Sequence, residues 1–227
     1  MNREEREDLI AYLEGFVTEN RKNRMTDVLG NRTRELTVVM ENIYQSQNAS
    51  AVLRHCDALG IQDVHIIENS NKWKTNPDVD LGTAQWLTVN RYNKEENNTV
   101  ETLRHLKSRG YRIIATSPHP GGYELDETDL SKGKAAIVFG TEMHGISDLV
   151  REEADEFLKI PMVGFVESFN ISASCAIVLY TLTQKLRALE TNWHLEEEAQ
   201  RELYLSWLRK SIKSVKQIEE RYRQKTP

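Results

Sequence analysis

Short apolar runs rich in β-branched residues alternate with stretches of helical periodicity in this 227-residue chain, and this alternation restricts its fold most. Runs of strand length lie at 36–40, 64–67, 111–116, 135–139 and 157–160, and helical patterns lie at 48–59, 100–109 and 171–189. Strands that alternate with helices are typical of an α/β domain with a mainly parallel sheet. We therefore predict an α/β domain over residues 36–189.

The two ends and one internal stretch depart from this pattern. Residues 1–35 predict a helical extension with a first helix over 9–17, and residues 190–227 predict a second extension with at least one amphipathic helix. The apolar stripe of that helix is formed by Tyr204, Leu208, Ile212, Val215, Ile218 and Tyr222. Residues 68–98 are polar and rich in Asn, and they predict a long surface loop with one strand-like piece at 86–89.

Charge is unevenly distributed along the chain, although the net charge is only −5. Residues 37–184 carry 13 basic against 20 acidic side chains, whereas residues 201–227 carry 8 basic against 3 acidic ones. An acidic middle with basic ends is the arrangement expected if the terminal segments bind a polyanion, and solvated helix faces are the alternative. The candidate RNA-binding residues are Arg21, Lys22, Arg24, Arg32, Arg34, Arg209, Lys210 and Lys213.

Other classes of protein find no support in the sequence. No apolar run approaches the roughly 18 residues of a membrane span, and the charged first residues do not form a secretory signal. Cys56 and Cys175 both lie in apolar helical patterns, which indicates reduced structural thiols in a cytoplasmic protein. Because no Cys and His cluster has metal-ligand spacing, we expect no metal.

Three segments break the α/β pattern, and the first is Asn48-Ala-Ser-Ala-Val-Leu-Arg54. Asn48 near a helix start can cap the helix or orient a neighbouring side chain. Arg54 projects from an otherwise apolar helix, where it is either a surface residue or a functional cation.

The second segment, Phe139-Gly-Thr-Glu-Met-His-Gly-Ile-Ser147, directly follows an apolar strand. Gly140 and Gly145 allow a sharp turn and a close approach to a ligand, at the end of a strand where open α/β folds bind ligands. The segment has neither the dinucleotide fingerprint nor the P-loop pattern. Glu142 could instead simply complement the start of a helix.

The third segment runs from Ile160 through Pro-Met-Val-Gly-Phe-Val-Glu-Ser-Phe-Asn-Ile to Ser172, where a strand ends and an apolar helix begins. Ser168 and Asn170 are ordinary capping residues on one interpretation. The other interpretation makes them part of a functional site.

Taken in this order, the three segments resemble the signature motifs of the SpoU branch of the SPOUT methyltransferases. Their layout is most similar to that of the TrmH family of tRNA guanosine 2′-O-methyltransferases. Phe169 departs from the family pattern, which commonly has Leu there. The resemblance implies an α/β fold with a C-terminal trefoil knot, a homodimer, and an active site that takes residues from both subunits.

The resemblance also implies a cofactor and a set of site residues. S-adenosyl-L-methionine, which leaves as S-adenosyl-L-homocysteine, would bind three loops at Thr116, Gly140, and Ile160 to Phe169. Methyl transfer from a sulfonium needs positioning and no metal. The catalytic candidates are Arg54, Asn48, Glu142, Ser168 and Asn170.

The short basic extensions resemble those of enzymes that methylate the guanosine at position 18 in the D loop of tRNA. The family members that act on ribosomal RNA often carry a separate N-terminal domain, for which the 35 residues before the first strand are too few. Three alternatives stay open: a ribosomal RNA 2′-O-methyltransferase, a non-catalytic RNA-binding protein of this fold, and a nucleotide-dependent oxidoreductase. The missing dinucleotide fingerprint disfavours the last of these.

Overall fold

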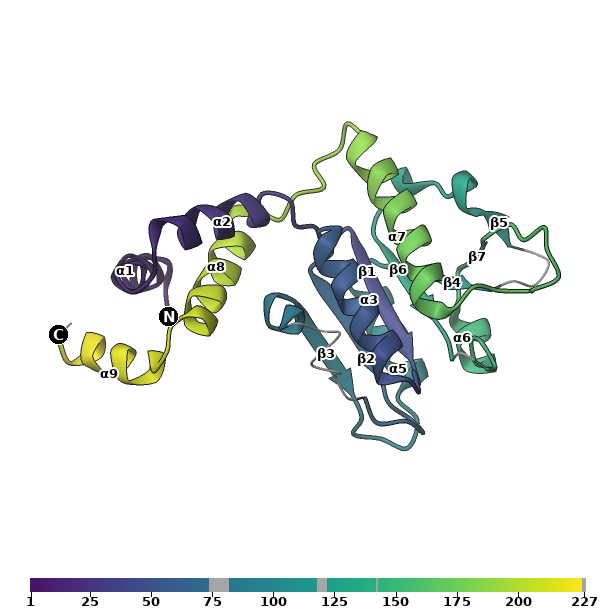
Figure 1. Ribbon diagram of the computed structural model, residues 1–227, viewed down its shortest axis with the longest axis horizontal. Coiled ribbons are helices and arrows are strands. Elements are labelled where there is room, and N and C mark those ends of the chain that lie inside the picture. The colour runs from purple at the N-terminus through teal and green to yellow at the C-terminus, as the bar shows by residue number, and fades with distance from the viewer. Residues whose placement is uncertain (74–81, 118–121, 142, 226–227) are drawn as a thin grey trace. The chain divides into compact units, whose positions relative to one another are not determined.

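The computed structural model describes residues 1–73, 82–117, 122–141 and 143–225. The chain divides into two compact units, a helical unit of Met1–Arg32 with His194–Pro227 and an α/β unit of Thr33–Trp193. The sequence predicts two separate extensions, 1–35 and 190–227. In the structure, both ends belong to the same helical unit (Figure 1).

A seven-stranded sheet in the order β3-β2-β1-β6-β4-β7-β5 forms the centre of the α/β unit, and every neighbouring pair in it is parallel. The predicted mainly parallel α/β fold is therefore confirmed, whereas the trefoil knot stays a prediction. The strands are β1 (Leu36–Glu41), β2 (Asp63–Ile67), β3 (Thr88–Tyr92), β4 (Arg112–Thr116), β5 (Tyr123–Glu124), β6 (Ala135–Phe139) and β7 (Glu156–Lys159).

Helices cover both faces of this sheet (Figure 1). The helices α3 (Ser46–Ala58) and α7 (Ile171–Ala188) pack on one face, and α5 (Thr99–Ser108) and α6 (Asp148–Glu153) pack on the other. Short 3-10 helices lie at Thr83–Trp86, Leu125–Glu127 and Leu130–Lys132. This two-sided cover explains why β1 and β6 are buried at every position.

Adjacent residues of the central strands pack into different hydrophobic cores, one on each face of the sheet. Val38 packs with α3 and α7, whereas its neighbour Val39 packs with α5 and α6. Ile137 and Val138 divide in the same way on β6, and all four side chains are fully buried. Because successive strand side chains point to opposite faces, one apolar run supplies both layers of the core.

The structure differs from the sequence prediction in several places. The first helix, expected over 9–17, spans Arg3–Glu14, and the short strand β5 was not predicted. The strand-like piece expected at 86–89 begins later and extends further, as β3 over Thr88–Tyr92. The C-terminal apolar stripe belongs to two helices, α8 (Glu197–Ser211) and α9 (Val215–Lys225), because Ser214 adopts a left-handed φ of 60° that interrupts the helix. The two cysteines were predicted as structural thiols, and both lie buried in the core between α3 and α7.

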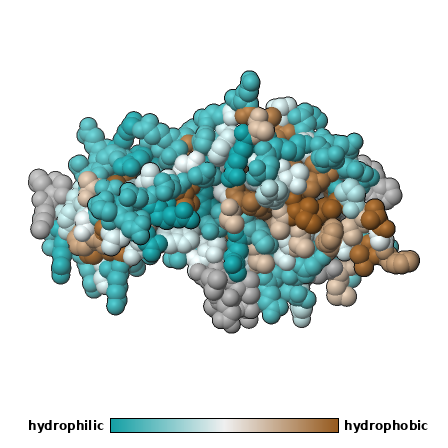
Figure 2. All heavy atoms as spheres, turned by 45° about the horizontal axis from the view of Figure 1, so that its top comes forward, coloured by the Kyte–Doolittle hydropathy of each residue, from teal (hydrophilic) through white to brown (hydrophobic). Residues whose placement is uncertain are grey.

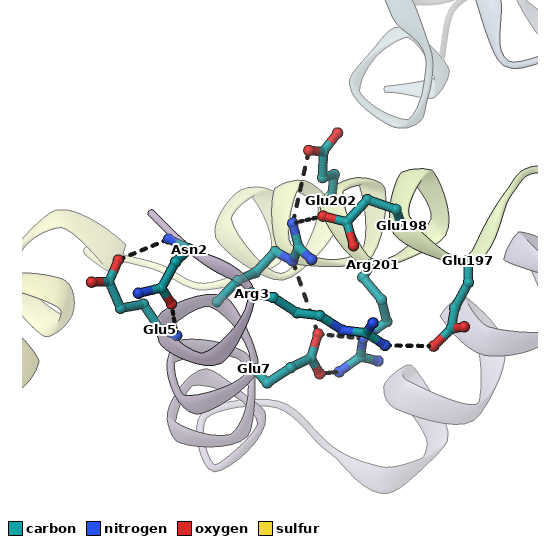
Figure 3. Close-up of polar contacts among 9 residues, drawn as sticks. Asn2, Arg3, Glu5, Glu7, Glu197, Glu198, Arg201 and Glu202 are labelled. Carbon is teal, nitrogen blue, oxygen red and sulfur yellow. Dashed lines mark hydrogen bonds and ion pairs between the residues drawn. The ribbon is translucent and has the colours of Figure 1, made fainter.

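The helical unit joins the two ends of the chain through ion pairs. Figure 3 shows charged side chains of α1 (Arg3–Glu14) and α8 directed at one another, among them Glu7 and Arg201. Arg6 of α1 pairs with Glu198 of α8, with 2.6 Å between the Nη1 and Oε1 atoms. Arg201 of α8 binds Glu7 of α1 in a bidentate pair. Arg6 is 5% exposed, whereas the side chains of its partners Glu198 and Glu202 are 56% and 66% exposed. The network joins α1 to α8 with its acidic groups in contact with solvent. The remaining helix of the unit is α2 (Glu19–Leu29).

Among the described residues, no helix has both the length and the apolar character that a membrane crossing requires.

The buried His65 of β2 makes the stability of the fold depend on pH. Burial, with a smaller contribution from Arg109 and His105, lowers the pKa of His65 to about 4. The unfolded chain, with a pKa near 6.5, therefore binds the proton more tightly, and stability falls as the pH drops below 6.5. We expect this group to lower the free energy of unfolding by about 2 kcal/mol between pH 7 and pH 5.

Urea unfolding at the two pH values measures this loss. The His65→Gln variant keeps an amide beside the Tyr92 hydroxyl, 2.9 Å from Nδ1 in the structure, and we expect it to lose much less stability. The exposed His144→Gln variant serves as the control and should behave like the wild type. A loss in His65→Gln as large as that of the wild type would contradict the assignment.

Candidate functional site

A cleft of about 550 Å³ opens at the carboxyl edge of the sheet. Its walls come from the loops that follow β1, β4, β6 and β7 and from the start of α7. Because all the strands are parallel, their carboxyl ends meet at this edge, where open α/β sheets bind ligands. The three motif segments of the sequence, which lie far apart along the chain, all contribute lining residues.

The second motif forms a tight loop after β6. The backbone of Thr141 and that of Gly145 exchange two hydrogen bonds, of 2.8 and 3.0 Å, which close the loop. A Cβ atom on Gly140 would lie 2.1 Å from the carbonyl of Gly145, so no side chain fits there. Gly145 has a φ of +66°, and a Cβ atom there would meet open space. Glycine is therefore favoured at this position by the backbone conformation and not by a steric clash.

The first and third motifs meet through a direct hydrogen bond. The Nδ2 of Asn170 donates to the Oδ1 of Asn48 at 3.2 Å, although the two residues are 122 positions apart. Asn48 donates in turn to Gln45 at 3.1 Å. Asn170 also caps α7 by accepting the backbone N–H of Ser172 at 2.8 Å, so its capping role and its place in the site coexist.

The predicted cofactor residues lie together. Thr116, Gly140, Ile160 and Phe169 all line the cleft. The hydroxyl of Thr116 donates to the carbonyl of Val138 at 2.9 Å, which fixes the end of β4 against β6. Phe169 is 44% exposed and supplies apolar surface at the wall of the cleft.

The catalytic candidates do not all line the cleft. Asn48, Ser168 and Asn170 line the cleft. Arg54 lies on α3, but its side chain is exposed and is not among the lining residues. Burial, with a smaller contribution from the charge of Arg54, lowers the pKa of the neighbouring His55. Glu142 lies outside the described residues.

Several lining residues were not singled out from the sequence. Gln45 precedes the first motif and holds Asn48, Ser117 follows β4, and Arg151 and Ser174 lie on the helices after the second and third motifs. Each is one or a few positions beyond a segment that was recognised. Proximity to those segments is the only signal in the sequence that could have identified them.

Half of the candidate RNA-binding residues are exposed on the helical unit. These are Arg21 and Arg24 on α2, Lys210 on α8, and Lys213 between α8 and α9. Exposed lysine and arginine side chains can contact a polyanion, and two of these four, Arg21 and Lys210, also interact within the protein.

The other candidates for RNA binding have partners within the protein. Arg32 is fully buried and its guanidinium lies over the Trp207 ring, 5.4 Å from the centroid, so its role in this structure is packing. Arg34 pairs with Asp63, Arg209 with Glu219, and Lys22 with Glu19.

The composition of the cleft suits a ligand that is part apolar and part polar. Backbone groups at Gly140 and apolar side chains such as Ile160 and Phe169 can hold a planar ring, and Asn48, Asn170 and Ser168 offer hydrogen bonds. No group of three His, Cys, Asp or Glu side chains that could hold a metal ion occurs in the described part of the chain.

Comparisons with known proteins agree with these features. A family model described as "SpoU rRNA Methylase family" matches residues 35–180. A tRNA (guanosine(18)-2′-O)-methyltransferase of Borreliella burgdorferi is 43% identical over 210 residues, which cover 92% of this chain and 94% of the relative.

Solved structures of other proteins have a similar fold. The crystal structure of the TrmH/SpoU tRNA modifying enzyme of A. aeolicus has a TM-score of 0.76 at 28% identity and covers 86% of this chain and 98% of its own. AviRb of Streptomyces viridochromogenes, in complex with the cofactor AdoMet, has a TM-score of 0.58 and covers 71% of this chain and 62% of its own. At 20% identity, it shows a likeness of fold alone.

The close approach at Gly140 predicts a large effect of a single methyl group. We expect Gly140→Ala to displace the 141–145 loop and to weaken binding of S-adenosylhomocysteine, measured by calorimetry, by tenfold or more, about 1.4 kcal/mol. Gly145→Ala is the matched control, because its Cβ meets nothing and only the positive φ costs about 1–2 kcal/mol of stability. Equal affinities of Gly140→Ala and the wild type would contradict this account of the loop.

Proposed function

Because the chain belongs to the SpoU rRNA methylase family, we propose that it transfers a methyl group from S-adenosylmethionine to a ribose 2′-hydroxyl of tRNA, at guanosine 18 of the D loop. The observation that carries this proposal is the cleft in which the three motif segments meet, joined by the hydrogen bond between Asn170 and Asn48. The name of the Borreliella burgdorferi relative supports the choice of tRNA and of position 18.

The cofactor in this proposal binds in the cleft. Thr116, Gly140, Ile160 and Phe169 would hold it, because backbone groups there can form hydrogen bonds and the apolar side chains can pack against a planar ring. Bound S-adenosylmethionine supplies an electrophilic methyl group on a sulfonium. The residues of the chain orient that group and keep water away, so positioning provides much of the rate.

Arg54 places the ribose in this proposal. A guanidinium has a pKa above about 12 and does not accept a proton readily, so we assign Arg54 to the phosphate beside the target ribose and not to the role of a general base. The 2′-oxygen forms the new bond to the methyl carbon as the carbon–sulfur bond breaks, and its proton leaves to that phosphate or to water. S-adenosylhomocysteine is the second product.

The remaining motif residues shape the site around this reaction. Asn48 and Asn170 hold each other, and Ser168 stands on the same wall of the cleft. Glu142 is included from the motif alone. We assign these four residues to contacts with the ribose and its surroundings. A hydrogen bond to a group that carries or develops a charge is stronger there than one between neutral groups.

The helical unit provides the main contact to the body of the tRNA. The exposed Arg21, Arg24, Lys210 and Lys213 are suited to phosphates, which carry no sequence information and therefore fix the position of the substrate. The buried Arg32 is left out of this proposed surface.

We further propose that two copies of the chain form the active enzyme. Large apolar side chains beside the cleft are exposed, among them Val163 and Phe165 at full exposure and Val166 and Tyr180 at more than half. Figure 2 shows apolar surface gathered on one side of the α/β unit. Contiguous exposed apolar surface of this kind marks an interaction site, and a second copy would cover it.

The proposed role of Arg54 predicts a specific pattern of activity. With radiolabelled S-adenosylmethionine and an unmodified tRNA transcript, we expect Arg54→Ala to lower kcat/KM by about a hundredfold or more, since it removes a charged contact that positions the hydroxyl. Arg54→Lys should recover only a small part, because an ammonium cannot bind a phosphate in the bidentate way.

Two outcomes of this assay would contradict the proposal in different ways. Near-full activity of Arg54→Lys would exclude the bidentate contact. Label on ribosomal RNA fragments but not on tRNA would keep the fold and the cofactor and would assign the enzyme to ribosomal RNA.

The proposed dimer is tested by sedimentation. The wild-type chain of 26.3 kDa should sediment as a dimer at micromolar concentration. We expect Phe165→Glu to sediment as a monomer, because association would bury its unpaired charge. Phe16→Asp, which changes an exposed aromatic residue of the helical unit, should stay dimeric. A dimeric Phe165→Glu variant would contradict the proposed interface.

A further inference from the structure

A buried carboxylate lies at the end of β1, outside the lining of the cleft. Glu41 is the last residue of β1 and is 1% exposed. A carboxylate that is removed from water needs hydrogen-bond donors, and Glu41 has three. The hydroxyls of Thr99 and Ser147 donate to its Oε1 at 2.7 and 2.8 Å, and the backbone N–H of Ser147 donates to its Oε2 at 3.1 Å.

Two of these donors belong to the residue at which the second motif ends. Ser147 is the N-cap of α6, and its hydroxyl also accepts the backbone N–H of Val150 at 3.2 Å. The Glu41 carboxylate therefore holds both the backbone and the side chain of Ser147. A charge-assisted pair of this kind is roughly twice as strong as a neutral hydrogen bond.

The other end of the same loop is held by the sheet. Met40 of β1 pairs with Phe139 of β6, so Glu41 and Gly140 follow at the same level on neighbouring strands. Between Gly140 and Ser147, the loop has no regular helix or strand in its described residues. It is closed by the hydrogen bonds between Thr141 and Gly145 and by the backbone N–H of His144, which donates to the Thr141 hydroxyl at 3.1 Å.

This loop forms a wall of the cleft. Gly140, Thr141 and Met143 to Ile146 line it, whereas neither Glu41 nor Ser147 is among the lining residues. The position of the wall relative to the sheet consequently depends on the strand at one end and on the Glu41–Ser147 pair at the other.

We propose that Glu41 and Ser147 are positioning residues, which act on the cofactor through the loop that they hold. This inference rests on the proposed function, in which the cleft binds S-adenosylmethionine. Loss of the pair frees the far end of the loop, so the cleft must be ordered again each time the cofactor binds, and affinity falls.

Thr99 provides a comparison that separates this role from a purely structural one. It donates to the same carboxylate, but it begins α5 and lies outside both the loop and the cleft lining. Thr99→Val removes one hydrogen bond from Glu41 and leaves both bonds to Ser147. A structural role alone would lower the stability of both Thr99→Val and Ser147→Ala and would leave the affinity for S-adenosylhomocysteine unchanged in both.

The experiment measures the dissociation constant of S-adenosylhomocysteine and the thermal midpoint of each full-length variant. We expect Ser147→Ala and Glu41→Gln to raise the dissociation constant by about tenfold or more. Ser147→Thr keeps the hydroxyl and should restore near wild-type affinity. Thr99→Val should lower the thermal midpoint but keep the affinity of the wild type.

Each outcome has one meaning. Wild-type affinity of Ser147→Ala, or an equal loss of affinity in Thr99→Val, overturns the positioning role. If Glu41→Gln does not fold, the comparison of Ser147→Ala with Ser147→Thr and Thr99→Val decides alone. A wild-type protein that binds no S-adenosylhomocysteine contradicts the proposed function itself and is distinguished from the other results by that observation.

Discussion

The pairing of β1 with β6 at the centre of a parallel sheet is the constraint on which the rest of the α/β unit depends. With β6 inserted between β1 and β4, the chain returns to the middle of the sheet after β1 to β3 on one side and β4 on the other, and β7 then follows on the outer side of β4. Parallel strands end at one edge, so the loops that follow β1, β4, β6 and β7 come together there. The cleft is a direct consequence of this order.

The residues at this edge then connect the loops in pairs. Asn48 and Asn170 join the loop after β1 to the start of α7, and the hydroxyl of Thr116 joins the end of β4 to β6. Glu41 joins the end of β1 to the start of α6 through Ser147. Each of these bonds lies in or next to the cleft, where ordering the loops in advance lowers the cost of binding a ligand.

The fold could be predicted because the local signals agree with one another. The apolar runs predicted β1, β2, β4, β6 and β7, and the motif segments predicted loops that line the cleft. The two-residue strand β5 is too short to leave such a pattern. The contact between Asn48 and Asn170 could not be predicted from the pattern of residues, since it depends on the strand order. The burial of Arg32 against Trp207 was missed for the same kind of reason, because a basic residue in a basic segment predicts a surface position. Likewise, a continuous apolar stripe gave no sign of the break at Ser214.

The most direct test of the account is methyl transfer to two tRNA transcripts that differ by a single oxygen atom. One carries guanosine at position 18, and the other carries 2′-deoxyguanosine there. With labelled S-adenosylmethionine, the account predicts one methyl group per molecule on the first transcript, recovered as 2′-O-methylguanosine, and none on the second. Equal labelling of both transcripts would place the methyl group elsewhere and would contradict the assignment of this chain as a ribose methyltransferase acting at that nucleotide.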